Sequence, residues 1–129
     1  MSKLDKESVI GISALLVHAA NIDEIYSDHE KDLVKNFIKS YLKDEDPDEI
    51  LQKAENLEND SNQLLNFTNI IKKNSFEVKK DIIEHLWKVI ISDNSIDQYE
   101  ANLMRRVCGL IYFPDKECAE IKLKLLNSK

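Results

Sequence analysis

Five carboxylates in two distant stretches, four of them at matching positions, are the strongest candidates for chemistry in this sequence. The first stretch holds Asp23 and Glu30, and the second holds Asp93, Asp97 and Glu100. Asp23 and Asp93 are separated by the same interval as Glu30 and Glu100. Carboxylate oxygens are the hard ligands that Ca²⁺ and Mg²⁺ prefer. If the fold brings the two stretches together, their carboxylates could share one divalent cation.

The same carboxylates also fit an explanation by helix capping alone. Ser27-x-x-Glu30 and Asp97-x-x-Glu100 both match the capping box, in which the two side chains satisfy backbone N–H groups at the start of a helix. Asp23 follows an apolar helical stretch, where Asp suits a turn because its side chain bonds to nearby backbone. The spacing does not fit an EF-hand loop, which needs a glycine and a longer interval before its Glu. Both explanations stay open at this point.

Two aromatic residues beside the second acidic stretch are candidates for a protein contact surface. Trp87 flanks the apolar stripe of one expected helix, and Tyr99 lies in the first turn of the next. Aromatic side chains with a polar group favour interfaces, and they also favour the edge of a small core. The sequence therefore predicts a protein partner, possible self-association into a homo-oligomer, or simple core packing here.

The remaining metal-binding residue types show no zinc pattern. Cys108 and Cys118 are the only cysteines, and no histidine lies close to them in the sequence. We expect two buried thiols in a reducing compartment. No two of the three histidines are four residues apart, so a zinc hydrolase is unsupported.

Composition and charge narrow the function classes further. The chain has 129 residues and a net charge of −6, which argues against nucleic acid or an anionic membrane surface as partner. Its longest apolar run, residues 10–20, is too short to span a bilayer, so no direct membrane insertion is expected. Acidic residues just before that run do not suit a signal peptide. The sequence predicts a cytoplasmic protein.

Apolar residues at helical spacing predict an all-α fold. Only 2 Gly and 2 Pro occur, and no stretch alternates long enough to form a strand. We expect a compact single-domain helical bundle of about seven helices over residues 1–129. The two acidic stretches would join helix pairs at about 5–43 and 75–113, related by an internal duplication of a helical hairpin. Linking helices at about 47–73 would close one side, and the apolar fifth helix would lie at the centre.

The two acidic turns carry a resemblance to a known family. The stretch from Ile90 to Leu110, with its echo from Asp23 to Leu33, resembles the tellurite-resistance TerB family, whose helices are joined by an "Asp-Gly-x-Ile-Asp/Ser-x-x-Glu" turn that is often written twice. That domain is similar to the N-terminal domain of the membrane-anchored J-domain co-chaperone. The turn glycine of the family is Glu24 in the first copy and Asn94 in the second. Because Glu adopts the left-handed conformation poorly, the first turn is expected to differ.

The resemblance implies an all-α, non-enzymatic cytoplasmic module associated with resistance to tellurite and other stresses. It also implies metal binding through an acidic surface, which carried over to this chain involves Asp23, Glu30, Asp93, Asp97 and Glu100. The alternative function is a ligand-free protein-interaction adaptor or co-chaperone-like scaffold that uses the surface near Trp87 and Tyr99.

Overall fold

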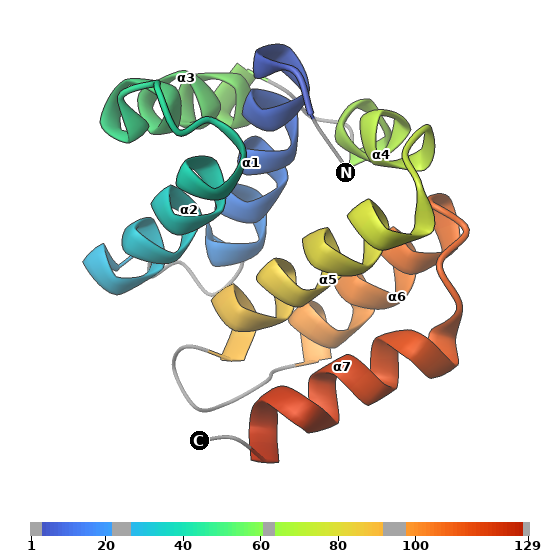
Figure 1. Ribbon diagram of the computed structural model, residues 1–129. Helices are drawn as coiled ribbons and strands as arrows, with labels where there is room; N and C mark the ends of the chain where they lie inside the picture. The colour runs from blue at the N-terminus through green and yellow to red at the C-terminus, as the bar shows by residue number, and fades with distance from the viewer. Residues whose placement is uncertain (1–3, 22–26, 61–63, 92–97, 128–129) are drawn as a thin grey trace.

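The computed structural model describes residues 4–21, 27–60, 64–91 and 98–127, with the side chains at 64–66 and 98–100 outside that description. Within these ranges the chain forms seven α-helices and no strand (Figure 1). The helices are α1 (Lys6–Asn21), α2 (Asp28–Tyr41), α3 (Pro47–Asp60), α4 (Leu64–Lys72), α5 (Phe76–Ile91), α6 (Gln98–Leu110) and α7 (Asp115–Asn127). The predicted all-α fold is confirmed.

Local sequence signals account for several helix starts. The carboxylate of Asp5 accepts the backbone N–H of Ser8 at 2.7 Å, and the Ser75 hydroxyl accepts that of Val78 at 3.3 Å. Each bond satisfies an N–H that the first turn of a helix leaves without an intrahelical partner. Pro47 opens α3, where the absence of its N–H costs no hydrogen bond.

The two helical hairpins have matching bounds. Helices α1 and α5 each contain 16 residues and begin at Lys6 and Phe76. Helices α2 and α6 begin at Asp28 and Gln98. Both pairs are therefore offset by the same interval that separates Asp23 from Asp93. The matching bounds agree with the expected duplication, and the common descent of the hairpins stays a prediction.

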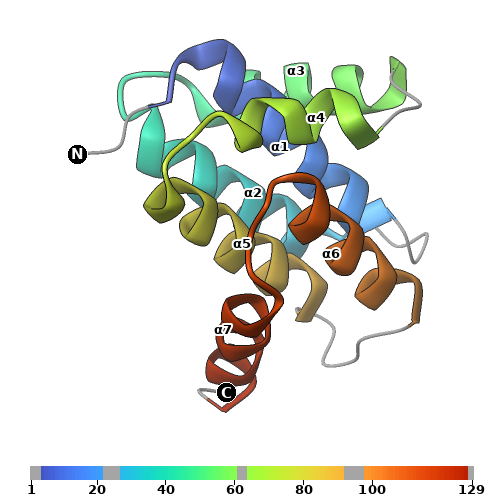
Figure 2. The ribbon, with the colours of Figure 1, turned by 90° about the vertical axis from the view of Figure 1, so that its right-hand side faces the viewer.

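The helices form two groups that meet through α1 and α5. Helix α3 packs on α1 and α2, and α7 packs on α5 and α6. In Figure 1 the first group lies at the upper left and the second at the lower right. Helix α4 contacts α1, α5 and α6 and so bridges the two groups (Figure 2). Helix α5 contacts α1, α2, α4, α6 and α7, so the prediction of a central fifth helix is confirmed.

The core lies where α1 and α5 face each other and their neighbours. Fully buried large side chains include Ile12, Leu15, Leu16, Phe37, Ile38, Ile82, Ile83, Leu86 and Ile90. Each such side chain stabilises the fold by about 1.5–3 kcal/mol relative to leaving it in water. This apolar contact holds the two groups of helices together and positions the helix ends described below.

A Schellman motif ends α6 and sets the direction of α7. The N–H of Phe113 donates to the carbonyl of Cys108 at 2.8 Å, and the N–H of Tyr112 donates to that of Gly109 at 3.4 Å. Tyr112 has φ 59°, the left-handed conformation that this motif requires and that favours glycine. Pro114 follows, and its carbonyl accepts the N–H of Cys118 at 3.1 Å to start α7.

None of the seven helices in the described ranges has the length and apolar character that a bilayer crossing requires.

Candidate functional site

The first acidic turn ends in a complete capping box at the start of α2. The Ser27 hydroxyl oxygen accepts the backbone N–H of Glu30 at 3.2 Å. The Glu30 carboxylate oxygen Oε1 accepts the backbone N–H of Ser27 at 2.9 Å and the Ser27 hydroxyl at 3.1 Å. Glu30 is only 5% exposed. The predicted cap is confirmed here, and it holds one carboxylate oxygen of Glu30 in place.

The other carboxylates of the predicted cation site fall outside the described residues. Asp23, Asp93 and Asp97 lie in ranges whose structure is not described, and Glu100 lies in the first turn of α6 with its side chain outside the description. Whether these carboxylates share a cation stays a prediction. Where side chains are described, no three His, Cys, Asp or Glu are grouped so that they could hold a metal ion.

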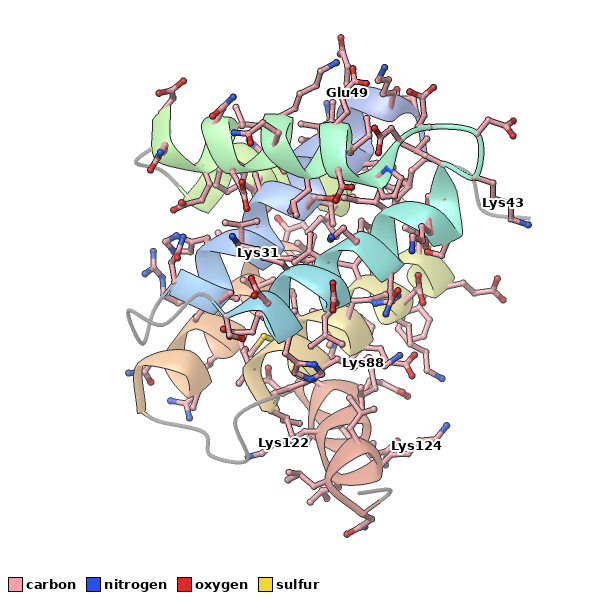
Figure 3. All side chains as sticks on the ribbon, turned by 90° about the vertical axis from the view of Figure 1, so that its left-hand side faces the viewer. Lys31, Lys43, Glu49, Lys88, Lys122 and Lys124 are labelled. Carbon is pink, nitrogen blue, oxygen red and sulfur yellow. The ribbon has the colours of Figure 1, made fainter. Side chains whose placement is uncertain are left out.

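The helix ends that flank the two acidic turns lie on the same side of the molecule. In Figure 1 the C-terminal ends of α1 and α5 and the N-terminal ends of α2 and α6 all lie toward the lower left of the bundle. Figure 3, viewed from the left of Figure 1, again places these four ends together, at its lower left. The packing of α1 against α5 brings the two hairpins together in this way.

The C-terminal end of α1 is fixed to α3 by one carboxylate. Glu58 accepts a hydrogen bond from the Asn21 side-chain amide at 3.1 Å, and its second oxygen lies 3.4 Å from Nδ1 of His18. His18 therefore has a structural partner. Because Glu58 lies on α3, this contact ties the C-terminal end of α1 to that helix.

A polar contact joins the two hairpins far from the acidic turns, between the C-terminal end of α2 and the N-terminal half of α5. The Tyr41 hydroxyl donates to Asp81 at 2.6 Å, and the other carboxylate oxygen of Asp81 lies 3.6 Å from Nε2 of His85. Burial, aided by the Asp81 carboxylate, raises the pKa of Tyr41. Burial lowers the pKa of His85, although Asp81 opposes that shift. His85 packs edge-on against Phe37, with ring centroids 5.1 Å apart, as a residue of the hairpin interface.

Of the two aromatic residues predicted to form a contact surface near the second turn, the structure describes the side chain of Trp87 alone. Trp87 is only 4% exposed and lies in the wall of a pocket between α5, α6 and α7, which is the position of a core residue. Its indole is thus not displayed as a surface contact. The side chain of Tyr99 lies outside the described residues, so its role stays a prediction.

Two features of the described structure were not anticipated from the sequence. Cys108 and Cys118 are free and buried, as predicted, but they also line one pocket together, Cys108 from α6 and Cys118 from α7. The available signal was their placement on either side of the Pro114 turn. The Tyr41–Asp81 bond had no local signal, since its two residues are far apart in the chain.

A comparison with protein families bears on the whole bundle. A family model described as "Tellurite resistance protein TerB" matches residues 10–123. The chain belongs to the TerB family. The match includes both acidic turns and all or most of every helix of this TerB-family protein. No curated protein and no solved structure matches the chain. The resemblance inferred from the duplicated turn is confirmed.

Proposed function

We propose that this TerB-family protein is a non-enzymatic module that binds Ca²⁺ or Mg²⁺ through its two acidic turns and serves resistance to tellurite or related stress in the cytoplasm. The residues proposed as ligands are Asp23, Glu30, Asp93, Asp97 and Glu100. The observation that supports this proposal is the common side of the bundle shared by the four helix ends that flank the turns (Figures 1 and 3).

The donor types available at this end suit a hard cation. In the sequence, Asp23 follows the C-terminal end of α1 and Asp93 follows that of α5. The C-terminal end of a helix also carries a partial negative charge that favours cations. The N-terminal ends of α2 and α6 have the opposite effect, which the carboxylates must offset. The net charge of −6 adds a long-range attraction for cations.

The capping box limits how Glu30 can take part. Its Oε1 accepts two hydrogen bonds from Ser27, so binding through that oxygen would compete with the cap. We therefore assign the main contribution to the aspartates, with Glu30 held in place by the cap. Calcium sites vary in affinity with the number of carboxylate ligands, so loss of two aspartates should weaken binding strongly.

Calorimetric titration with CaCl₂ and with MgCl₂ tests this function. The full chain is compared with an Asp93→Ala/Asp97→Ala variant and with an Asp44→Ala/Glu120→Ala control. Asp44 and Glu120 are exposed and do not belong to either acidic turn, so the control removes the same charge from other places. We expect saturable binding by the wild type and the control, and its loss in the turn variant.

Equal heats from all three proteins would contradict the assignment of the turns. A wild type that binds neither cation would instead favour the alternative function, a ligand-free protein-interaction adaptor or co-chaperone-like scaffold.

A further inference from the structure

The cysteine pair lies at the junction of α5, α6 and α7. Cys108 is 1% exposed and Cys118 is 7% exposed, and the two free cysteines line the same pocket. The Schellman motif after α6 and the Pro114 turn bring them together. These backbone hydrogen bonds fix where α7 begins relative to α6, so the placement of the two cysteines follows from the fold.

A pocket of about 320 Å³ gives small molecules access to the pair. Its lining includes both thiols together with Trp87, Arg105, Asp115 and Lys122. Each water in the liquid occupies roughly 30 Å³, so a molecule the size of hydrogen peroxide fits easily. Two cationic side chains against one carboxylate give the pocket walls a positive balance.

The surroundings of Cys118 favour its thiolate. The Trp87 indole N–H is buried and has no hydrogen-bond partner among the described residues, and Trp87 lines the same pocket. The Lys122 ammonium lies 5.6 Å from the centre of the Trp87 ring, reaching from α7 toward the end of α5 (Figure 3). A thiolate at Cys118 would give the indole donor an acceptor and Lys122 a counter-charge.

The pKa values of the two thiols shift in opposite directions. A hydrogen bond from Cys108, followed by the Trp87 N–H and the Lys122 charge, lowers the pKa of Cys118, against burial and the Asp115 carboxylate. The hydrogen bond to Cys118 and burial raise the pKa of Cys108. These opposite directions favour Cys118 over Cys108 as the thiol that ionises first.

We propose that Cys108 and Cys118 form a dithiol site that reacts with hydroperoxides, in which Cys118 attacks and Cys108 closes a reversible disulfide. The Cys118 thiolate attacks the terminal oxygen of the hydroperoxide and breaks the O–O bond. Cys118 becomes a sulfenic acid, and the departing alkoxide or hydroxide takes a proton to leave as alcohol or water. The Cys108 sulfur then attacks the Cys118 sulfur, the S–O bond breaks, and hydroxide leaves with the Cys108 proton as water.

The electron balance of this reaction is complete. Two thiols lose two electrons in forming the disulfide, and the hydroperoxide is reduced to an alcohol, or to water, plus one water. A small dithiol reductant restores the pair by thiol–disulfide exchange. The inference is independent of cation binding, because none of its residues belongs to the acidic turns.

Peroxide oxidation of the full reduced chain tests the site. With one equivalent of hydrogen peroxide at pH 7, we expect both thiols to be lost and the intact mass to fall by two hydrogens, with no dimer on a non-reducing gel. Peptide mapping should join Cys108 to Cys118, and dithiothreitol should restore both thiols. Persistent free thiols, or a disulfide between chains, would overturn the proposal.

Single variants separate the roles of the two cysteines. Cys108→Ser should accumulate a sulfenic acid at Cys118 that dimedone traps, whereas Cys118→Ser should react roughly tenfold or more slowly, as a thiol of raised pKa does. Circular dichroism checks that each variant is folded. Equal reactivity of the two variants would contradict the assigned roles.

Trp87→Phe removes only the indole N–H and keeps an aromatic ring in the pocket wall. The rate of Cys118 alkylation by iodoacetamide in the wild type should fall as the pH drops through about 7, where Cys118 loses its thiolate. Trp87→Phe should move this decline to higher pH and slow alkylation at pH 6 by roughly threefold to tenfold. Among the described residues, the other titratable groups that line this pocket are Cys108, Asp115, Lys122 and Arg105, and they are unchanged in this variant. An unchanged profile would show that the indole does not stabilise the thiolate.

Discussion

The two halves of the bundle, α1 to α3 and α5 to α7, use one packing arrangement with different chemistry. In each half the third helix covers the first two. Trp87 and Cys108 correspond to Val17 and Ile38 by the spacing between the hairpins. Cys118 corresponds to Ile50, because the N–H of each makes the first backbone hydrogen bond of the third helix in its half.

The three positions of the first half are apolar and almost completely buried. The same positions in the second half hold an indole and two thiols beside a pocket. The fold therefore requires only that these positions be buried and of suitable size. Packing alone does not require the indole N–H and the two thiols of the second half. For this reason we propose a chemical role for them.

The largest expected difference between the halves is at the position of Trp87. Trp87→Ala removes a buried aromatic side chain and should lower the free energy of unfolding by about 3–5 kcal/mol. Val17→Ala, the matched change in the first half, removes far less volume and should lower it by about 1–2 kcal/mol. Urea unfolding followed by circular dichroism measures both. Tryptophan fluorescence would not serve, because Trp87 is the only tryptophan and one variant lacks it. A cost at Trp87 no larger than at Val17 would show that its indole does not support the core.

The contact between the halves should respond to removal of one hydroxyl. Tyr41→Phe breaks the bond to Asp81 and should lower the free energy of unfolding by about 1–2 kcal/mol, toward the lower value because Asp81 is partly exposed. Tyr112→Phe is the control, because the Tyr112 ring is largely exposed. Chemical denaturation at pH 7 compares the three proteins. Equal losses in both variants would mean that the Asp81 bond adds nothing.

The two acidic turns offer a direct comparison of helix caps. Ser27→Ala removes the side chain that caps α2 and should lower the free energy of unfolding by about 1 kcal/mol. Asp97→Ala should have a similar effect if Asp97 caps α6, as the sequence predicts. Thermal unfolding in the presence of a chelator removes any contribution from bound cation. A loss at Ser27 without one at Asp97 would show that the two turns are not equivalent.

The smallest expected effect is a gain at Gly109. This residue corresponds to Lys39 in the first half, and a methyl group added there would meet no atom within 4 Å apart from its chain neighbours and the nearby backbone of its own helix. Gly109→Ala should raise the free energy of unfolding by about 0.5–1 kcal/mol, because alanine favours the helix more than glycine does. Lys39→Ala, in the same position of α2, should change it little. A destabilised Gly109→Ala protein would indicate that this helix end needs the freedom of glycine.

Most of the fold was predictable because its signals are local. Ser27 and Glu30 are three residues apart, so the sequence itself indicates their cap. Pro47 and Pro114 mark helix boundaries for the same reason. Trp87 was harder to interpret, because an indole beside an apolar stripe suits both a core and an interface. Its burial depends on α6 and α7, whose placement no pattern around Trp87 contains.

The sequence by itself determined the helices and the capping box at α2, because each depends on residues within a few turns of one another. It also carried the repeated acidic turn and the resemblance to the TerB family, because both rest on short motifs. Only the tertiary structure decided that the helix ends beside both turns share one side, that Tyr41 bonds Asp81, and that Cys108 meets Cys118 beside a buried indole. These residues become neighbours because apolar helix faces pack together. The apolar pattern specifies which faces are buried, but the polar contacts depend on how the packed helices are finally arranged.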